Sequence, residues 1–130
     1  MKIIFDRYRN SKYEIKTIPF TNFGDLENYI IRLDQTEFSE VILKDKNNEL
    51  RISGGRYNFL ISIKVDGETF DLINSNQNNF QEQIPVMIKG QSFIFSPNLI
   101  VNFEKALVAS KYFCQHKGIE RSLYWKKRFT

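Results

Sequence analysis

An uninterrupted alternation of large apolar side chains with other residues between positions 57 and 65 restricts the fold more than any other feature of this sequence. Alternate residues of a β-strand share one face, so the run predicts a strand with five large side chains on one side. The dipeptide Asp66-Gly67 follows directly, and the β-rich segment Glu68-Thr69-Phe70 comes next. This order is typical of a tight antiparallel hairpin. The five alternating residues are Tyr57, Phe59, Ile61, Ile63 and Val65.

Two other segments show the helical period. In each of them apolar residues recur at steps of three and four positions, which places them on one face of a helix. We therefore expect helices over about residues 23–34 and 103–117. Asn102 can cap the first turn of the second helix, and basic residues near its end, just before Gly118, complement the helix dipole.

Shorter β-rich runs fill most of the remaining chain and stop at glycines or prolines. Together the patterns predict an α+β fold, in which an antiparallel sheet of five to seven strands packs with the two main helices. The polar segment 74–83 is expected to be a loop, and residues 126–130 are expected to fray. The β-rich runs cover residues 2–8, 13–18, 38–43, 50–52, 84–88 and 93–95.

The length and composition suit one soluble domain. The chain has 130 residues, of which 42% are hydrophobic, so we treat residues 1–130 as a single unit with a core of its own. The sequence contains no run of about 18 apolar residues that could span a bilayer. The run Ile3-Ile4-Phe5 is too short for a signal peptide, and a single cysteine cannot form an internal disulfide. We expect a cytoplasmic protein with no membrane partner.

No residue pattern in the sequence requires catalysis. Cys114 and His116 are two positions apart on a predicted helix, so their side chains point about 200° apart and cannot form a nucleophile–base pair. One cysteine and one histidine are also too few for a common zinc site. The acids Asp66, Glu68 and Asp71 are expected to be solvated. We therefore expect no enzyme activity, no cofactor and no metal.

Charge is distributed unevenly along the chain. Of the net charge of +4, residues 1–16 carry +3 (five basic, two acidic) and residues 111–130 carry +5 (six basic, one acidic), which leaves −4 for residues 17–110. A basic patch can bind phosphates, so a nucleic-acid-binding module is the alternative function that the charge leaves open. A solvated surface is the commoner role of such residues, and nucleic acid is not the partner that we expect. The patch consists of Lys111, Lys117, Arg121, Lys126, Lys127 and Arg128.

Residues 49–125 carry an ordered series of turn, helix and aromatic positions. A strand enters a glycine pair, and an alternating strand follows. A Gly-Gln turn and a proline precede a helix with an acidic-x-Ala-Leu core, after which a glycine and a tryptophan occur. In this order the segment resembles the immunity-protein family numbered first in the bacterial polymorphic-toxin classification. The positions concerned are Gly54, Gly55, Gly90, Gln91, Pro97, Glu104, Ala106, Leu107, Phe113, Gly118 and Trp125.

The resemblance implies an immunity-protein-like α+β domain that binds a cognate toxin domain, frequently a deaminase or nuclease, and neutralises it by stoichiometric inhibition. The matching positions are expected to be structural, so toxin contacts are sought on loops of the sheet. Direct and allosteric blockade, and a monomer and a homodimer, all remain open on this basis. The candidate interface residues are Asp66, Glu68, Asp71, Asn78 and Phe80.

Overall fold

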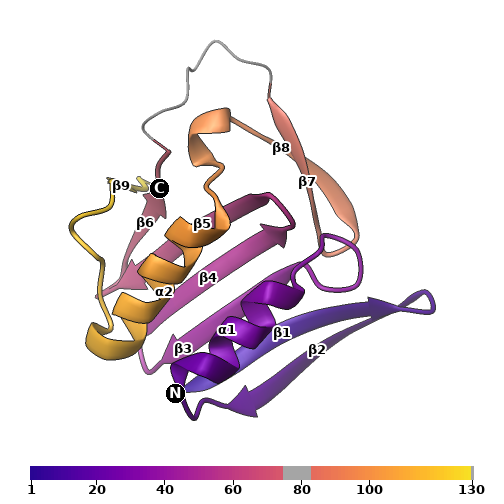
Figure 1. The fold of residues 1–130 in the computed structure, drawn as a ribbon, viewed down its shortest axis with the longest axis horizontal. Coiled ribbons are helices and arrows are strands. Elements are labelled where there is room, and N and C mark those ends of the chain that lie inside the picture. Colours follow the sequence, from indigo (N-terminus) through magenta and orange to yellow (C-terminus); the bar gives the residue numbers. More distant parts are fainter. Residues whose placement is uncertain (75–82, 130) are drawn as a thin grey trace.

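The computed structural model of the chain describes residues 1–74 and 83–129. Strands predominate, and the two α-helices lie in the first quarter and the last third of the chain (Figure 1). In chain order the elements are β1 (Lys2–Arg9), β2 (Lys12–Pro19), α1 (Phe23–Arg32), β3 (Glu40–Asp45), β4 (Asn48–Gly55), β5 (Asn58–Val65), β6 (Glu68–Leu72), β7 (Ile84–Ile88), β8 (Gln91–Phe95), the 3₁₀ turn η1 (Pro97–Leu99), α2 (Phe103–His116) and β9 (Trp125–Lys127).

Among the described residues, seven strands form one antiparallel sheet in the order β2-β1-β3-β4-β5-β6-β9. The remaining strands, β7 and β8, pair with each other in a separate two-stranded sheet. Most neighbours in the large sheet are also consecutive in the chain, as expected for a sheet built from hairpins. The predicted α+β fold, with five to seven strands in the sheet and two main helices, is confirmed.

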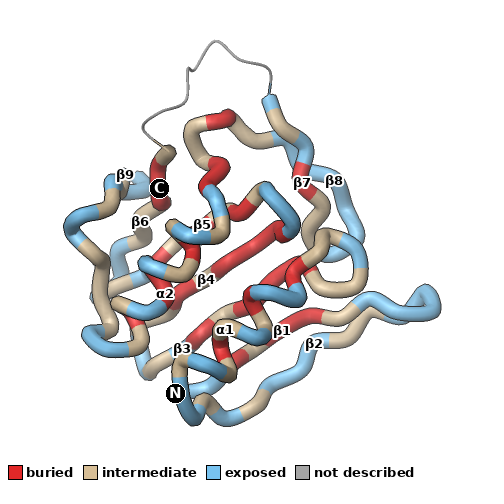
Figure 2. Tube along the Cα trace, in the orientation of Figure 1, coloured by how far each residue is buried: buried red, intermediate tan, exposed pale blue. Residues whose placement is uncertain are grey.

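Both helices cover the same face of the seven-stranded sheet, and the hydrophobic core lies between them and the sheet (Figure 1). The central strands carry the most buried positions (Figure 2). On β5, Phe59, Ile61 and Ile63 belong to this core and are at most 3% exposed, as the alternation predicted. Tyr57 does not share their environment, because it lies in the β4–β5 turn and is 90% exposed. We call the sheet face opposite the helices the open face.

Two-residue turns in the left-handed region close three of the hairpins. Asp66-Gly67 joins β5 to β6, with φ values of 52° and 81°, and confirms the hairpin expected there. Lys89-Gly90 joins β7 to β8, with φ values of 56° and 76°. Asn10-Ser11 closes the β1–β2 hairpin in the same way. Left-handed pairs twist the chain in the direction that antiparallel strands require.

The helices begin where the sequence predicted and end slightly earlier. Asn102 caps α2 by accepting the backbone N–H of Lys105 at 2.9 Å, and Asn22 caps α1 in the same way. Helix α2 ends at a left-handed Lys117, with φ of 55°, so the residue that terminates it precedes the expected Gly118. The helices have 10 and 14 residues. In the described part of the chain, no helix has the length and apolar character needed to cross a membrane.

The C-terminal segment is ordered as a strand rather than frayed from residue 126. Residues of β9 pair with β6, with Trp125 opposite Leu72. The Trp125 indole packs against the core and donates its N–H to the backbone oxygen of Glu120 at 2.9 Å. Sequence periodicity could not reveal this strand, because its three residues are too few to show an alternation.

The glycine pair at the end of β4 allows two backbone segments to approach closely. Gly55 has φ of +134°, and a Cβ atom there would lie 2.3 Å from the carbonyl oxygen of Leu33, just after α1. Gly54 has φ of +98°, and its Cβ would meet the backbone oxygen of Asn58 at 2.4 Å and the Val86 side chain at 3.1 Å. Any other residue would separate these segments. The pair therefore brings α1 and β7 into contact with the end of β4.

The other positions of the resemblance are also placed by the structure. Pro97 is buried and begins η1, and Leu107 packs against the core from α2. Glu104 is exposed in the first turn of α2, where a negative charge complements the helix dipole. Packing and local backbone geometry therefore explain why these residue types occur at these positions.

Replacing Gly55 by alanine is expected to lower the free energy of unfolding by about 3 kcal/mol or more, because the new Cβ would collide with the backbone of Leu33. The control is Gly67→Ala, since Gly67 also has a left-handed φ, +81°, but has nothing within 4 Å of its Cβ direction. That variant should lose only about 1 kcal/mol. Urea unfolding measures both values, and equal losses would contradict the close approach at Gly55.

Candidate functional site

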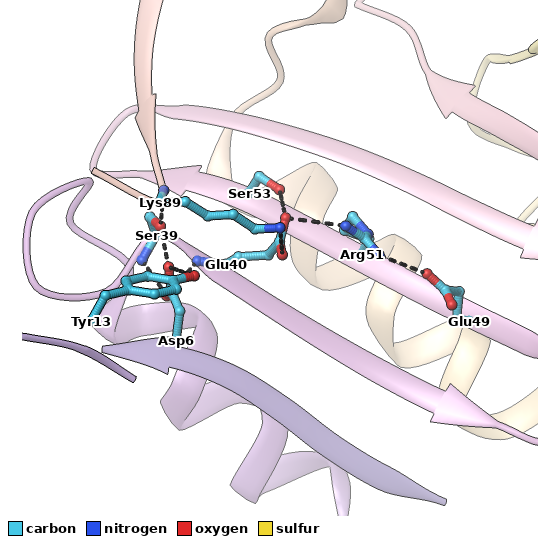
Figure 3. A network of polar contacts seen from close by, with 8 residues as sticks. All are labelled: Asp6, Tyr13, Ser39, Glu40, Glu49, Arg51, Ser53 and Lys89. Carbon is cyan, nitrogen blue, oxygen red and sulfur yellow. Dashed lines mark hydrogen bonds and ion pairs between the residues drawn. The ribbon is translucent and has the colours of Figure 1, made fainter. Parts of the chain in front are cut away.

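A network of polar side chains, buried at its centre and partly exposed at its ends, crosses the open face where β1, β3 and β4 meet the β7–β8 hairpin (Figure 3). We call it the buried network. Its centre is Asp6 on β1, which is only 4% exposed. Oδ1 of Asp6 accepts the backbone N–H groups of Ser39 at 2.8 Å and Glu40 at 2.9 Å. Oδ2 accepts the hydroxyl groups of Ser39 and of Tyr13, the latter at 3.3 Å. Four donors thus compensate for the burial of this carboxylate.

Glu40 is the second buried carboxylate, and it connects β3 with β4 and the hairpin. Its Oε2 accepts the hydroxyl of Ser53 at 3.1 Å and the guanidinium of Arg51 at 3.5 Å. Its Oε1 lies 3.7 Å from the ammonium nitrogen of Lys89. Arg51 also donates to Glu49 at 3.2 Å. Basic and acidic side chains therefore alternate along the open face and neutralise one another, in the order Lys89, Glu40, Arg51 and Glu49.

Tyr13 ties the edge strand β2 to this network. Burial raises the pKa of the Tyr13 phenol, and the adjacent Asp6 carboxylate raises it further. The phenol therefore stays neutral at physiological pH and continues to donate its proton to Asp6.

The network fixes the β7–β8 hairpin to the sheet through its turn. The backbone N–H of Lys89 donates to the Ser39 hydroxyl oxygen at 2.9 Å, while the ammonium of the same residue faces Glu40. On β7 itself, the backbone N–H of Met87 donates to the side-chain oxygen of Gln35 at 2.9 Å. Backbone and side-chain contacts together hold the hairpin in one orientation.

The titratable groups away from the network present no activated nucleophile in the described part of the chain. Burial raises the pKa of the Cys114 thiol to about 11, so its reactive thiolate is scarce at neutral pH. His116 is exposed and stacks on Tyr112, with ring centroids 4.4 Å apart. No group of three or more His, Cys, Asp or Glu side chains in residues 1–74 and 83–129 is placed to hold a metal ion.

The outer strand of the hairpin, β8, is largely exposed. Phe93 is 45% exposed and Ile94 is 66% exposed, whereas Val86 on β7 is fully buried. The register pairs Val86 with Phe93, so the backbone groups of Ser92 and Ile94 point away from β7. Within the described residues, no strand pairs with that outward edge of β8.

Two hollows flank the hairpin. The first is a cavity of about 290 Å³ between the open face, the hairpin and η1, and it includes Arg51, Phe95 and Leu99 in its lining. The second is an open groove of about 510 Å³ on the other side of the hairpin turn, between Tyr8 and Met87. Both hollows exist because the network holds the hairpin at the end of the sheet.

Of the acidic residues nominated as a toxin interface, Asp66 and Glu68 lie away from this network, whereas Asp71 lines the first hollow together with Arg51. Asp66 is exposed in the β5–β6 turn. Glu68 forms an ion pair with Lys127 at 3.0 Å, and Asp71 is bound by Arg128 through two contacts, at 2.5 and 3.1 Å. The other two nominated residues, Asn78 and Phe80, lie outside the described residues.

The same ion pairs involve two of the six residues of the basic patch. Lys127 and Arg128 are neutralised by acids of β6, and the pKa of the Arg128 guanidinium is raised by its hydrogen bonds to Asp71. Lys111 and Arg121 are exposed on α2 and on the loop after it. The six basic residues therefore do not act as one block of free positive charge.

Sequence reasoning missed the residues of the buried network. One signal could have found Asp6: it is an acid that directly follows the apolar run 3–5 within a predicted strand. Ser39, Glu40 and Lys89 carry no comparable signal. Ser39 and Glu40 meet Asp6 only through the pairing of β1 with β3, and Lys89 meets Ser39 only through the docking of the hairpin.

Comparison with known proteins does not assign a family. No protein-family model matches this sequence, and no curated protein matches it.

Replacing Ser39 by alanine is expected to lower the free energy of unfolding by about 2 kcal/mol, because the buried Asp6 carboxylate loses one of its donors and the part-buried amide of Lys89 loses its acceptor. The amide of Lys89 should also exchange its hydrogen faster, since its acceptor is removed. The control is Ser92→Ala on exposed β8, which should change stability by less than about 0.5 kcal/mol. Unchanged exchange at Lys89 in Ser39→Ala would show that the hairpin does not depend on this link.

Proposed function

We propose that this chain is an immunity protein that binds a cognate bacterial toxin domain, of the deaminase or nuclease kind, and neutralises it by stoichiometric inhibition. The observation that carries the proposal is an exposed apolar strand on a hairpin that a buried network holds in place. The class of the partner is supported by the resemblance over residues 49–125. The proposal assigns the chain no catalytic turnover of its own.

The exposed edge of β8 favours a protein partner. Natural proteins usually protect the edges of their sheets with charges, prolines or covering segments, because an open edge invites pairing with another chain. On β8 the outward edge instead carries Ile94, which is 66% exposed, next to the partly exposed Phe93. Apolar and aromatic side chains at such a position are typical anchors of protein interfaces.

Rigidity of the hairpin supports inhibition by a preformed surface. Lys89 is held through its backbone by Ser39 and through its side chain by Glu40. A surface that is already ordered loses little conformational entropy when it binds, so more of the contact energy is available for affinity. A contact of at least about 1,000 Å² around β8 would be sufficient for a specific complex.

The charges of the C-terminal strand favour this proposal over the nucleic-acid-binding alternative. Lys127 and Arg128 are exposed, but each already forms an ion pair, with Glu68 and Asp71 respectively. A polyanion would have to compete with these ion pairs before it could use the patch, which reduces the gain from counterion release.

The proposal predicts that Ile94→Arg abolishes neutralisation of the toxin encoded beside this chain and weakens the complex at least about 100-fold. Ile31→Arg on α1 is the control, because Ile31 is similarly exposed, at 59%, but lies on the helical side of the protein. Calorimetry with the purified toxin domain and a growth-rescue assay provide the two measurements. A complex that tolerates Ile94→Arg as well as Ile31→Arg would exclude β8 from the interface.

The nucleic-acid alternative makes a separate prediction. An immunity protein should show no tight binding to free DNA or RNA, whereas a nucleic-acid-binding module should lose affinity steeply as salt rises from about 50 to 200 mM. Filter binding across this range distinguishes the two. Micromolar affinity that falls with salt, and that Lys126→Glu reduces, would replace the proposal by the alternative.

A further inference from the structure

The cavity of about 290 Å³ beside the hairpin has the composition of a small-molecule site. Its volume lies at the lower end of the range for ligand pockets and corresponds to roughly ten water-sized groups. Apolar side chains from four elements, β5, β7, β8 and η1, form one wall, and polar residues of the open face form the other. The apolar wall consists of Leu60 on β5, Ile88 and Phe95 on the hairpin, and Leu99 on η1.

The charged acceptor in the lining of the cavity, Asp71, already has a partner. Asp71 uses both carboxylate oxygens on Arg128, at 3.1 and 2.5 Å. The hydroxyl of Ser53 donates to Glu40 at 3.1 Å. The Asp71–Arg128 pair is partly exposed at the rim, and its charges cancel. Within the described lining, a cationic ligand would therefore find no unpaired carboxylate.

Donors, in contrast, remain available on Arg51 and Ser62. A guanidinium has five N–H donors, and Arg51 uses two of them, on Glu40 at 3.5 Å and on Glu49 at 3.2 Å. In the described part of the chain, neither the remaining donors of Arg51 nor the hydroxyl of Ser62 has a partner.

These two residues are placed to act together. Arg51 on β4 and Ser62 on β5 are directly opposite in the sheet register, so both side chains project from the same spot of the open face. Both line the cavity, and the Arg51 side chain is 40% exposed, so the site is open to solvent. Donors from adjacent strands that converge on an apolar hollow match a ligand with an acceptor group at one end.

We propose that this cavity binds a small organic acid whose carboxylate is held by Arg51 and Ser62 and whose aromatic or branched apolar body lies on Leu60, Phe95 and Leu99. A carboxylate fits because its two oxygens match the parallel N–H groups of a guanidinium. The volume limits the body to about one aromatic ring with a short chain. The site goes beyond the proposed function, since its occupation requires no partner protein.

An NMR titration of the ¹⁵N-labelled full chain with 3-phenylpropionate tests the proposal. Saturable shifts are expected at the amides around Arg51, Ser62 and Phe95, with a Kd of about 1 mM or tighter. The amide analogue, 3-phenylpropionamide, should bind at least about 10-fold more weakly, and acetate, which lacks the apolar body, should not saturate. Equal affinity for acid and amide, shifts centred elsewhere, or no saturation by about 20 mM would overturn the proposal.

Two variants locate the site independently. Ser62→Phe should fill the cavity and abolish binding, while Arg51→Lys should keep the charge but weaken binding about 10-fold, because an ammonium cannot form the paired contact. Arg121→Lys, on an exposed loop, is the control and should bind like the unmodified chain. Thermal unfolding of each variant establishes that it is folded. Unchanged affinity in folded Arg51→Lys and Ser62→Phe would place the ligand outside this cavity.

Because no toxin takes part in this titration, its outcome is separate from that of the proposed function. Loss of probe binding with intact toxin neutralisation would overturn the cavity assignment alone. Probe binding together with a failed neutralisation assay would support the cavity and remove the proposed function. The cavity assignment and the proposed function are therefore tested by different measurements.

Discussion

The carboxylate of Asp6 is the interaction on which the arrangement of the open face depends. It belongs to β1, but it accepts the backbone N–H groups of Ser39 and Glu40 where β3 begins. Without it these buried donors would have no partner, at a cost of about 1–3 kcal/mol each. Ser39 in turn accepts the N–H of Lys89, so the same carboxylate determines where the hairpin lies. One acid thus connects three segments that are distant in sequence.

The two faces of the sheet have different physical roles. The helix-covered face excludes water and supplies the apolar burial that stabilises the domain, with Phe113 of α2 fully buried at its centre. The open face instead holds two buried carboxylates, Asp6 and Glu40, which are tolerated there because Asp6 accepts from several donors and Glu40 is paired with opposite charges. This division leaves the hairpin, β8 and the adjacent cavity accessible, and it provides them with a rigid support.

Ion pairs between β6 and β9 shape the electrostatics of the other end of the sheet. Glu68 and Asp71 meet Lys127 and Arg128 across the strand pair, so an acidic hairpin and a basic tail that look separate in the sequence form one nearly neutral edge. Exposed pairs of this kind add little stability, but they remove free charge of both signs. Under the proposed function, recognition of the toxin domain is therefore expected to depend on the apolar strand β8 more than on net charge.

The sequence alone determined the α+β class, the β5–β6 hairpin and the two helices, because these depend on local periodicity, caps and turn residues that neighbouring positions share. It predicted structural roles for Gly54, Gly55 and Trp125, but not the segments that they contact. Only the tertiary structure decided the site: strand pairing brings Asp6 to Ser39, hairpin docking brings Lys89 to Glu40, and register sets Arg51 opposite Ser62. Such contacts join residues that are far apart along the chain, and no local pattern encodes a distance in space.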